Sequence, residues 1–81
     1  MNSSSINNKV KQIIISVLGI NEDEYSDELA IGDIPEWDSI NHVILIQQIE
    51  EDFDISIDVT DAIDIEDVFD IIATLKKYNI N

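Results

Sequence analysis

Ser39 and His42 are the two side chains that could share covalent chemistry in this 81-residue chain, which has a single histidine. Their spacing of three residues would place both on one face of a helix. A serine nucleophile also needs a base oriented by a third group and donors for the oxyanion, and the sequence has no G-x-S-x-G elbow. No catalytic residue is therefore predicted, and His42 is expected to be an exposed helix residue on a docking face.

The acidic run from Asp52 to Asp58 spaces oxygen ligands at alternate positions, as calcium-binding loops do. Such a loop needs glycine at its sixth position and glutamate at its twelfth, but Ile57 and Ile63 stand there. The chain also has no cysteine, which removes thiolate metal sites and disulfides. The sequence therefore predicts no dedicated metal site.

Asp38 and Ser39 are both residue types that begin helices, and they follow turn residues at Gly32, Asp33 and Pro35. A phosphate on Ser39 would lie beside unpaired backbone N–H groups and the positive end of the helix dipole. An Asp-Ser pair is also common at helix starts for capping alone. These two residues by themselves leave open whether Ser39 is a cap or a modification site.

Apolar residues at helical spacing predict a first helix from about Ser4 to Leu18, ended by Gly19. A long acidic loop follows, and Leu29 and Ile31 are expected to attach it to the core. A second helix is predicted from Asp38 and Ser39 to about Asp52. Its expected inward stripe is Ile40, Val43, Ile46 or Gln47, Ile49 or Glu50, and Phe53.

The remainder of the chain predicts an extended connector over residues 55–59 and a brief helical turn capped by Thr60 or Asp61. A capping box of Asp64 and Asp67 is expected to open a last helix that ends near Lys76 and Lys77. The prediction is an all-α fold, a small four-helix bundle of three longer helices and one short helix with a long first loop. It would form one domain over residues 1–81, with an ordered core at about 4–78.

Four lysines against eighteen acidic residues give a net charge of −14, and every carboxylate side chain lies between Glu22 and Asp70. Such a surface repels nucleic acid and attracts basic protein patches. No apolar run approaches the ~20 residues that span a bilayer, and the N-terminus does not resemble a secretory leader. We expect protein partners with basic docking patches, no nucleic acid, no membrane insertion and a cytoplasmic location.

Asp38-Ser39-Ile40 resembles the Asp-Ser-Leu attachment motif of acyl carrier proteins. The run from Ile49 to Phe53 is similar to the leucine-glutamate-glutamate-phenylalanine ending of a helix in that family, and the resemblance extends from the first helix to about Leu75. It implies a 4′-phosphopantetheine arm, transferred from coenzyme A to Ser39 by a phosphopantetheinyl transferase, with Asp38 as the flanking acid. The implied function is to carry acyl or aminoacyl groups as thioesters to loading and transfer enzymes of fatty acid, lipid or secondary metabolite biosynthesis, as a monomer.

The resemblance has departures that point to a specialised, stand-alone carrier. Asn41 and Ile44 stand where fatty-acid carriers usually have acidic residues, and Ile40 replaces the usual leucine. Trp37 before Asp38 is more similar to carriers that serve peptide synthetases or polysaccharide pathways; it is expected to anchor the loop in the core or, alternatively, to lie beside the root of the arm. The predicted partner face comprises Glu36, Trp37, Ile40, Asn41, Ile44, Glu50 and Glu51.

The charge distribution also suits a protein of another class, an acidic interaction module or nucleic-acid mimic without a prosthetic group. The two hypotheses differ at Ser39, because a mimic should tolerate Ser39→Ala whereas a carrier should lose all function and keep its fold.

Overall fold

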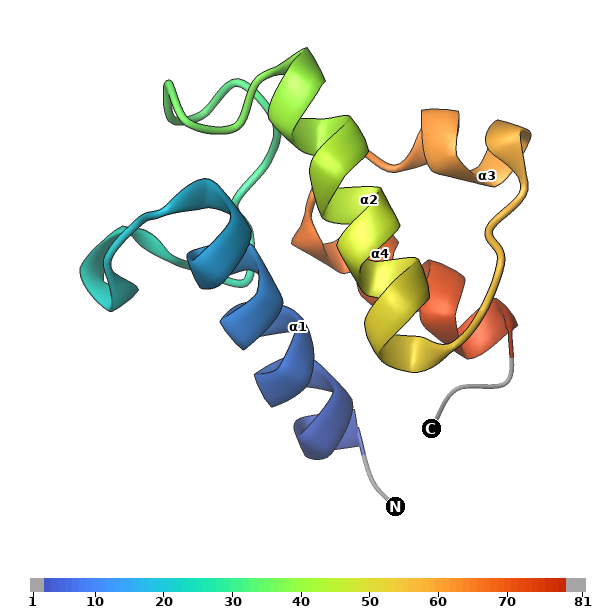
Figure 1. The fold of residues 1–81 in the computed structure, drawn as a ribbon. Coiled ribbons are helices and arrows are strands. Elements are labelled where there is room, and N and C mark those ends of the chain that lie inside the picture. The colour runs from blue at the N-terminus through green and yellow to red at the C-terminus, as the bar shows by residue number, and fades with distance from the viewer. Residues whose placement is uncertain (1–2, 79–81) are drawn as a thin grey trace.

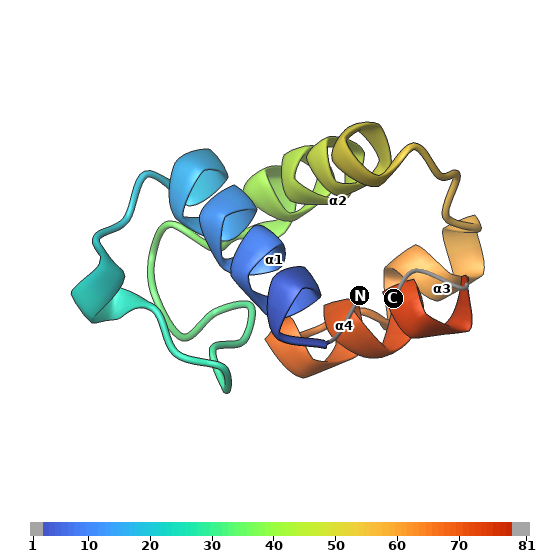
Figure 2. The ribbon, with the colours of Figure 1, turned by 90° about the horizontal axis from the view of Figure 1, so that it is seen from below.

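The computed structural model of the protein describes residues 3–78, with side chains from Ser5 onward. The described residues form four α-helices, α1 (Ser3–Leu18), α2 (Ser39–Phe53), α3 (Val59–Asp64) and α4 (Val68–Lys77), and one 3-10 helix, η1 (Glu22–Glu24). α1 packs against α2 and α4, while the short α3 lies on the side of the bundle away from α1 (Figures 1 and 2). The predicted all-α bundle of three longer helices and one short helix is confirmed.

The core of the bundle is built from the facing stripes of the three longer helices. α1 contributes residues at helical spacing, and α2 and α4 supply the opposite walls. The fully buried side chains are Val10 and Ile14 of α1, Leu45 and Ile49 of α2, Val68, Ile71 and Leu75 of α4, and Trp37 from the loop before α2. None of the helices in the described part of the chain is long and apolar enough to cross a membrane.

α1 ends where the sequence predicts, because Gly19 takes up a left-handed conformation with φ +67°. The backbone N–H groups of Gly19 and Ile20 both donate to the carbonyl oxygen of Ile15, at 2.9 and 3.3 Å. These two bonds satisfy a carbonyl that the end of the helix would leave without a partner. The side chain of Ile20 is buried directly after this turn, so the cap also directs the chain back to the core.

Gly19→Ala is expected to lower the free energy of unfolding by about 1 kcal/mol, because an L side chain is strained at positive φ. A Cβ at Gly19 would meet no atom within 4 Å, so backbone strain is the only cost. Urea denaturation measures the change, with the exposed Ser16→Ala on the same helix as control. An unchanged midpoint would show that the left-handed cap does not contribute.

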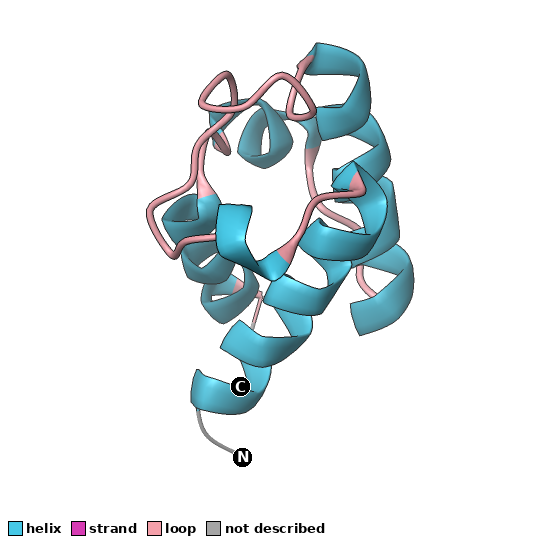
Figure 3. Ribbon diagram, turned by 90° about the vertical axis from the view of Figure 1, so that its left-hand side faces the viewer, coloured by secondary structure: helices cyan, strands magenta, loops and turns pink. Residues whose placement is uncertain are grey.

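The connection between α1 and α2 is the largest loop, and it is tied down at several points (Figure 3). Leu29 is buried, as predicted, and its carbonyl oxygen accepts from the N–H of Val68 at 3.0 Å. The N–H of Ile31 donates to the carbonyl of Glu66 at 2.8 Å, so the loop forms a short bridge to the chain just before α4. Near the start of this loop, burial and the neighbouring Asp27 raise the pKa of Tyr25 to about 12.

The predicted inward stripe of α2 is only partly correct. Ile46 and Ile49 are buried, but Ile40 and Val43 are exposed, and Leu45 takes the central buried position instead. Apolar residues cover most of the circumference of α2, so their spacing alone does not select a face. Packing against α1 determines which face of α2 is buried, and it leaves Ile40 and Val43 exposed to solvent.

The predicted starts of α3 and α4 are also corrected. α3 begins at Val59 with Asp58 at its N-cap position, two or three residues before the expected caps, Thr60 or Asp61. α4 begins at Val68 because Asp67 is the N-cap, its Oδ1 accepting from the N–H of Asp70 at 2.7 Å. Asp67 also pairs with Ala30 across the bridge, which keeps residues before it extended. The side chain of Ile65 is buried in the core, but Ile65 lies on the connector between α3 and α4 and not in α4.

Asp61 of α3 joins this helix to the end of α4. Its carboxylate accepts from Lys77 Nζ and from the Tyr78 hydroxyl, both at 2.8 Å. Both hydrogen bonds lower the pKa of Asp61, and the bond from Lys77 has the larger effect. The Tyr78 hydroxyl oxygen in turn accepts from the backbone N–H of Asp58 at 2.9 Å, next to the start of α3.

Asp61→Asn is expected to lower the melting temperature, with an effect that depends on pH. A carboxylate whose pKa is lowered on folding stabilises the fold above its unfolded value of 3.8, and that stabilisation is lost as the pH falls through the folded pKa. The difference between wild type and variant should therefore be present at pH 7 and decline below pH 3.8, as the pH falls through the folded pKa. Thermal unfolding across this range measures it, with Asp64→Asn in the same helix as control; a difference that persists in strong acid would contradict the role of this carboxylate.

Candidate functional site

Ser39 is an exposed side chain at the first position of α2. Asp38 is the N-cap, and its carboxylate accepts from the N–H of Asn41 at 2.8 Å. The backbone N–H groups of Ser39 and Ile40 precede the first intrahelical bond, which the N–H of His42 makes to the carbonyl of Asp38 at 2.8 Å. Asp38 therefore caps the helix, and Ser39 is exposed at its positive end without serving as the cap.

The loop before Ser39 is fixed to the helix by Trp37, the residue two positions earlier. Trp37 has no exposed surface, and its indole N–H donates to Nδ1 of His42 at 3.0 Å. The two rings are stacked with centroids 6.1 Å apart. Asn41 adds a second tie, because its side-chain amide donates to the carbonyl of Glu36 at 2.7 Å. The expected role of Trp37 as a loop anchor agrees with this burial.

His42 is not the exposed residue that the sequence predicts, because the stacked indole half-buries its ring. No hydrogen bond joins its imidazole to the Ser39 hydroxyl among the described residues, and Nδ1 is already occupied by Trp37. A serine and histidine arranged in this way do not form the nucleophile and base of a hydrolase. The Nε2 atom of His42 is buried and makes no hydrogen bond to any residue in the described part of the chain.

An apolar groove begins at His42 and runs between α2 and α3. It has a volume of about 330 Å³. α2 supplies His42, Val43, Ile46, Gln47 and Glu50, while the connector and α3 supply Ile57, Val59, Ala62 and Ile63. The sequence analysis missed this groove; the available signal was that Val59 and Ile63, four residues apart, form an apolar face on a helix too short to bury it.

The predicted partner-face residues divide into two groups. Ile40 is 73% exposed and Ile44 46% exposed, on one face of α2, and Glu51 is exposed near the end of the same helix. Glu50 is half-buried because its Oε2 accepts from the N–H of Ile57 at 2.7 Å. Trp37 is wholly inside the protein, so its side chain is not part of a surface face.

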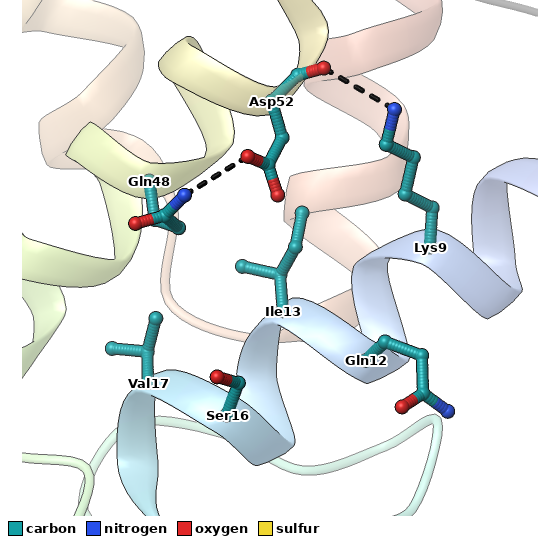
Figure 4. Close-up of a pocket in the computed structure, with 7 residues that line it drawn as sticks. All are labelled: Lys9, Gln12, Ile13, Ser16, Val17, Gln48 and Asp52. Carbon is teal, nitrogen blue, oxygen red and sulfur yellow. Dashed lines mark hydrogen bonds between the residues drawn. The ribbon is translucent and has the colours of Figure 1, made fainter.

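A second hollow lies between α1 and α2, toward the opposite end of α2 from Ser39 (Figure 4). Its volume is about 210 Å³. Lys9 Nζ donates to the carbonyl of Asp52 at 3.2 Å, and Gln48 donates to the carboxylate of Asp52 at 2.9 Å. The Lys9 bond joins α1 to the end of α2, and the Gln48 bond lies within α2. Within residues 3–78, no group of three or more acidic or histidine side chains is arranged to hold a metal ion.

Comparison with known proteins identifies the family. The family described as phosphopantetheine attachment site matches residues 8–75. An acyl carrier protein of Chlorobium phaeovibrioides is 37% identical over 62 residues, covering 76% of this chain and 80% of the relative. An acyl carrier protein of Akkermansia muciniphila is 31% identical over 77 residues, 95% of this chain and 96% of the relative. With the attachment-site match across most of its length, the chain belongs to the acyl carrier protein family, whose members carry 4′-phosphopantetheine.

Proposed function

We propose that this protein is a single, non-enzymatic carrier domain that holds acyl or aminoacyl groups as thioesters on a 4′-phosphopantetheine arm attached to Ser39. The observation that carries the proposal is the exposed Ser39 hydroxyl at the start of α2, between the N-cap Asp38 and an apolar groove. The arm supplies the thiol that forms the thioester. The chain supplies the attachment point, its orientation and the surface that partners contact.

The residues around Ser39 suit a phosphodiester. The N–H groups of Ser39 and Ile40 have no intrahelical acceptor, and the helix dipole favours an anion at this end by about 0.3–1 kcal/mol. The carboxylate of Asp38 opposes this effect in part, but its Oδ1 is already engaged with the N–H of Asn41. Trp37 and Asn41 hold the loop, so the attachment point is fixed relative to α2.

The surface beside Ser39 supports protein partners of a particular kind. Ile40, Val43 and Ile44 form an exposed apolar strip on α2, with Glu36, Asp38 and Glu51 near its ends. A partner enzyme that fits this surface has an apolar centre and a basic rim. We propose that a phosphopantetheinyl transferase and the enzymes that load or remove the cargo dock here, with the acidic rim steering them to the site.

An acidic mimic that binds by charge alone is less well supported. Such a protein needs carboxylates over its contact surface, whereas the first turns of α2 expose three apolar side chains. A contiguous patch of exposed apolar side chains is typical of a surface that binds a protein partner. Their position directly after Ser39 favours the carrier.

Intact mass spectrometry tests the proposal. The protein is incubated with coenzyme A and a broad-specificity phosphopantetheinyl transferase, beside a known carrier as positive control. A gain of one phosphopantetheinyl group by the folded protein is the expected result. If the positive control is modified and this protein is not, the carrier function fails and a search for a basic binding partner replaces it.

A further inference from the structure

The hydrogen bond from Trp37 fixes the proton position on His42. The indole N–H can only donate, so Nδ1 of His42 must present a lone pair. A neutral imidazole carries its one proton on the other nitrogen, and a doubly protonated imidazole could not accept this bond. Nε2 of His42 is therefore an N–H donor in the folded protein.

This donor has no acceptor among the residues that the structure describes. Nε2 is shielded from solvent and makes no hydrogen bond. Buried N–H groups are nearly always paired, and an unpaired one calls for a ligand or another explanation. The neighbouring groove is lined mainly by aliphatic side chains, and the carboxylate of Glu50 is already engaged with the N–H of Ile57.

His42 lies at the place where an arm on Ser39 would enter the groove. The two residues are three apart on α2, so they are neighbours on the helix surface. The imidazole lines the groove together with Val43 of α2 and Ile63 of α3. Both of these aliphatic side chains are more than half exposed, so a ligand that enters the groove beside the imidazole has room to displace them.

We propose that His42 is a positioning residue whose Nε2–H donates a hydrogen bond to an amide carbonyl of the phosphopantetheine arm and holds the arm against the groove between α2 and α3. This inference rests on the proposed attachment at Ser39. An amide carbonyl is the suitable acceptor because it is uncharged and can enter an apolar groove at less cost than a phosphate. The phosphate remains at the start of α2, where backbone N–H groups are available.

Nuclear magnetic resonance of the loaded protein tests this assignment through the mobility of the arm. The protein is loaded from coenzyme A labelled with ¹⁵N in the pantetheine amides, and the heteronuclear NOE of these amides is measured. In the wild type we expect positive values that approach those of the α2 backbone. In His42→Phe, which keeps a ring but has no donor, we expect the values of free coenzyme A.

Gln47→Ala is the matched control, because Gln47 lines the same groove but takes no part in the bond between Trp37 and His42. It should keep most of the arm order. The assignment is overturned if the wild-type arm is as mobile as free coenzyme A, if His42→Phe leaves it ordered, or if Gln47→Ala releases it equally. A protein that gains no arm at all contradicts the proposed function instead, so the two failures are distinguishable.

A measurement on the wild type alone guards against a misfolded variant. The chain has one histidine, so the imidazole N–H resonance belongs to His42 without ambiguity. Its exchange with water should slow by about fivefold on loading, which corresponds to a net hydrogen bond of about 1 kcal/mol. Equal exchange rates before and after loading would overturn the assignment.

Discussion

Ser39→Ala is expected to abolish attachment of the phosphopantetheine arm, with no modified protein detectable by intact mass. The hydroxyl is the only atom of this exposed side chain that can form the phosphodiester, and no neighbouring serine or threonine shares its place at the start of α2. The fold should not change, because Asp38 and not Ser39 caps the helix. Stability should lie within about 0.5 kcal/mol of the wild type.

Ser56→Ala is the matched control for this experiment. Ser56 is also exposed, but it lies on the connector between α2 and α3, away from a helix start. This variant should load as the wild type does. Modification of Ser39→Ala to the wild-type extent would mean that the arm is attached at another residue.

Trp37→Ala is expected to lower the free energy of unfolding by about 3–5 kcal/mol, the largest effect on stability of any single change considered. The side chain is fully buried and its removal would leave a cavity between the loop and α2. It would also leave Nδ1 of His42 without its donor. Urea denaturation at neutral pH measures the loss.

Phe69→Ala controls for the removal of an aromatic ring. Phe69 of α4 is 74% exposed, so its truncation should change stability by no more than about 0.5 kcal/mol. Similar effects of the two substitutions would contradict the anchoring role of Trp37. If the anchor acts as inferred, Trp37→Ala should also slow arm transfer even where the protein remains folded, because the loop before Ser39 loses its fixed point.

α1 shows how much of the fold the sequence determines locally. Its apolar residues recur with one helical period, Gly19 ends it, and the structure agrees within one residue. α2 does not carry such a signal, because apolar residues lie on several of its faces. Which of them are buried depends on tertiary packing against α1 and not on the local sequence.

The starts of α3 and α4 also depend on contacts from elsewhere in the chain. Asp64 and Asp67 have the spacing of a capping box, but so do Asp67 and Asp70, and local sequence does not distinguish them. The bridge between Ala30 and Asp67 does, because it holds the chain extended until Asp67. A contact that spans so many residues cannot be read from periodicity.

The proposed attachment point was predictable from the sequence, but its surroundings were not. Asp38-Ser39 at a predicted helix start left a cap and a modification site open, and the resemblance along the rest of the chain singled out Ser39. The bond between Trp37 and His42 crosses the helix start and joins a loop residue to the first turn, so neither helical nor strand spacing indicates it. The groove depends on the orientation of α3, which only the folded chain defines.

The most direct test of the account is to locate the arm in the wild-type protein. After loading from coenzyme A, the protein is digested and the modified peptide is fragmented in a mass spectrometer. We predict one phosphopantetheinyl group, carried by Ser39 and by no other residue. Two results would contradict the assignment of Ser39 as the attachment site. The group could be found on a different side chain, or the protein could stay unmodified while a known carrier is fully loaded.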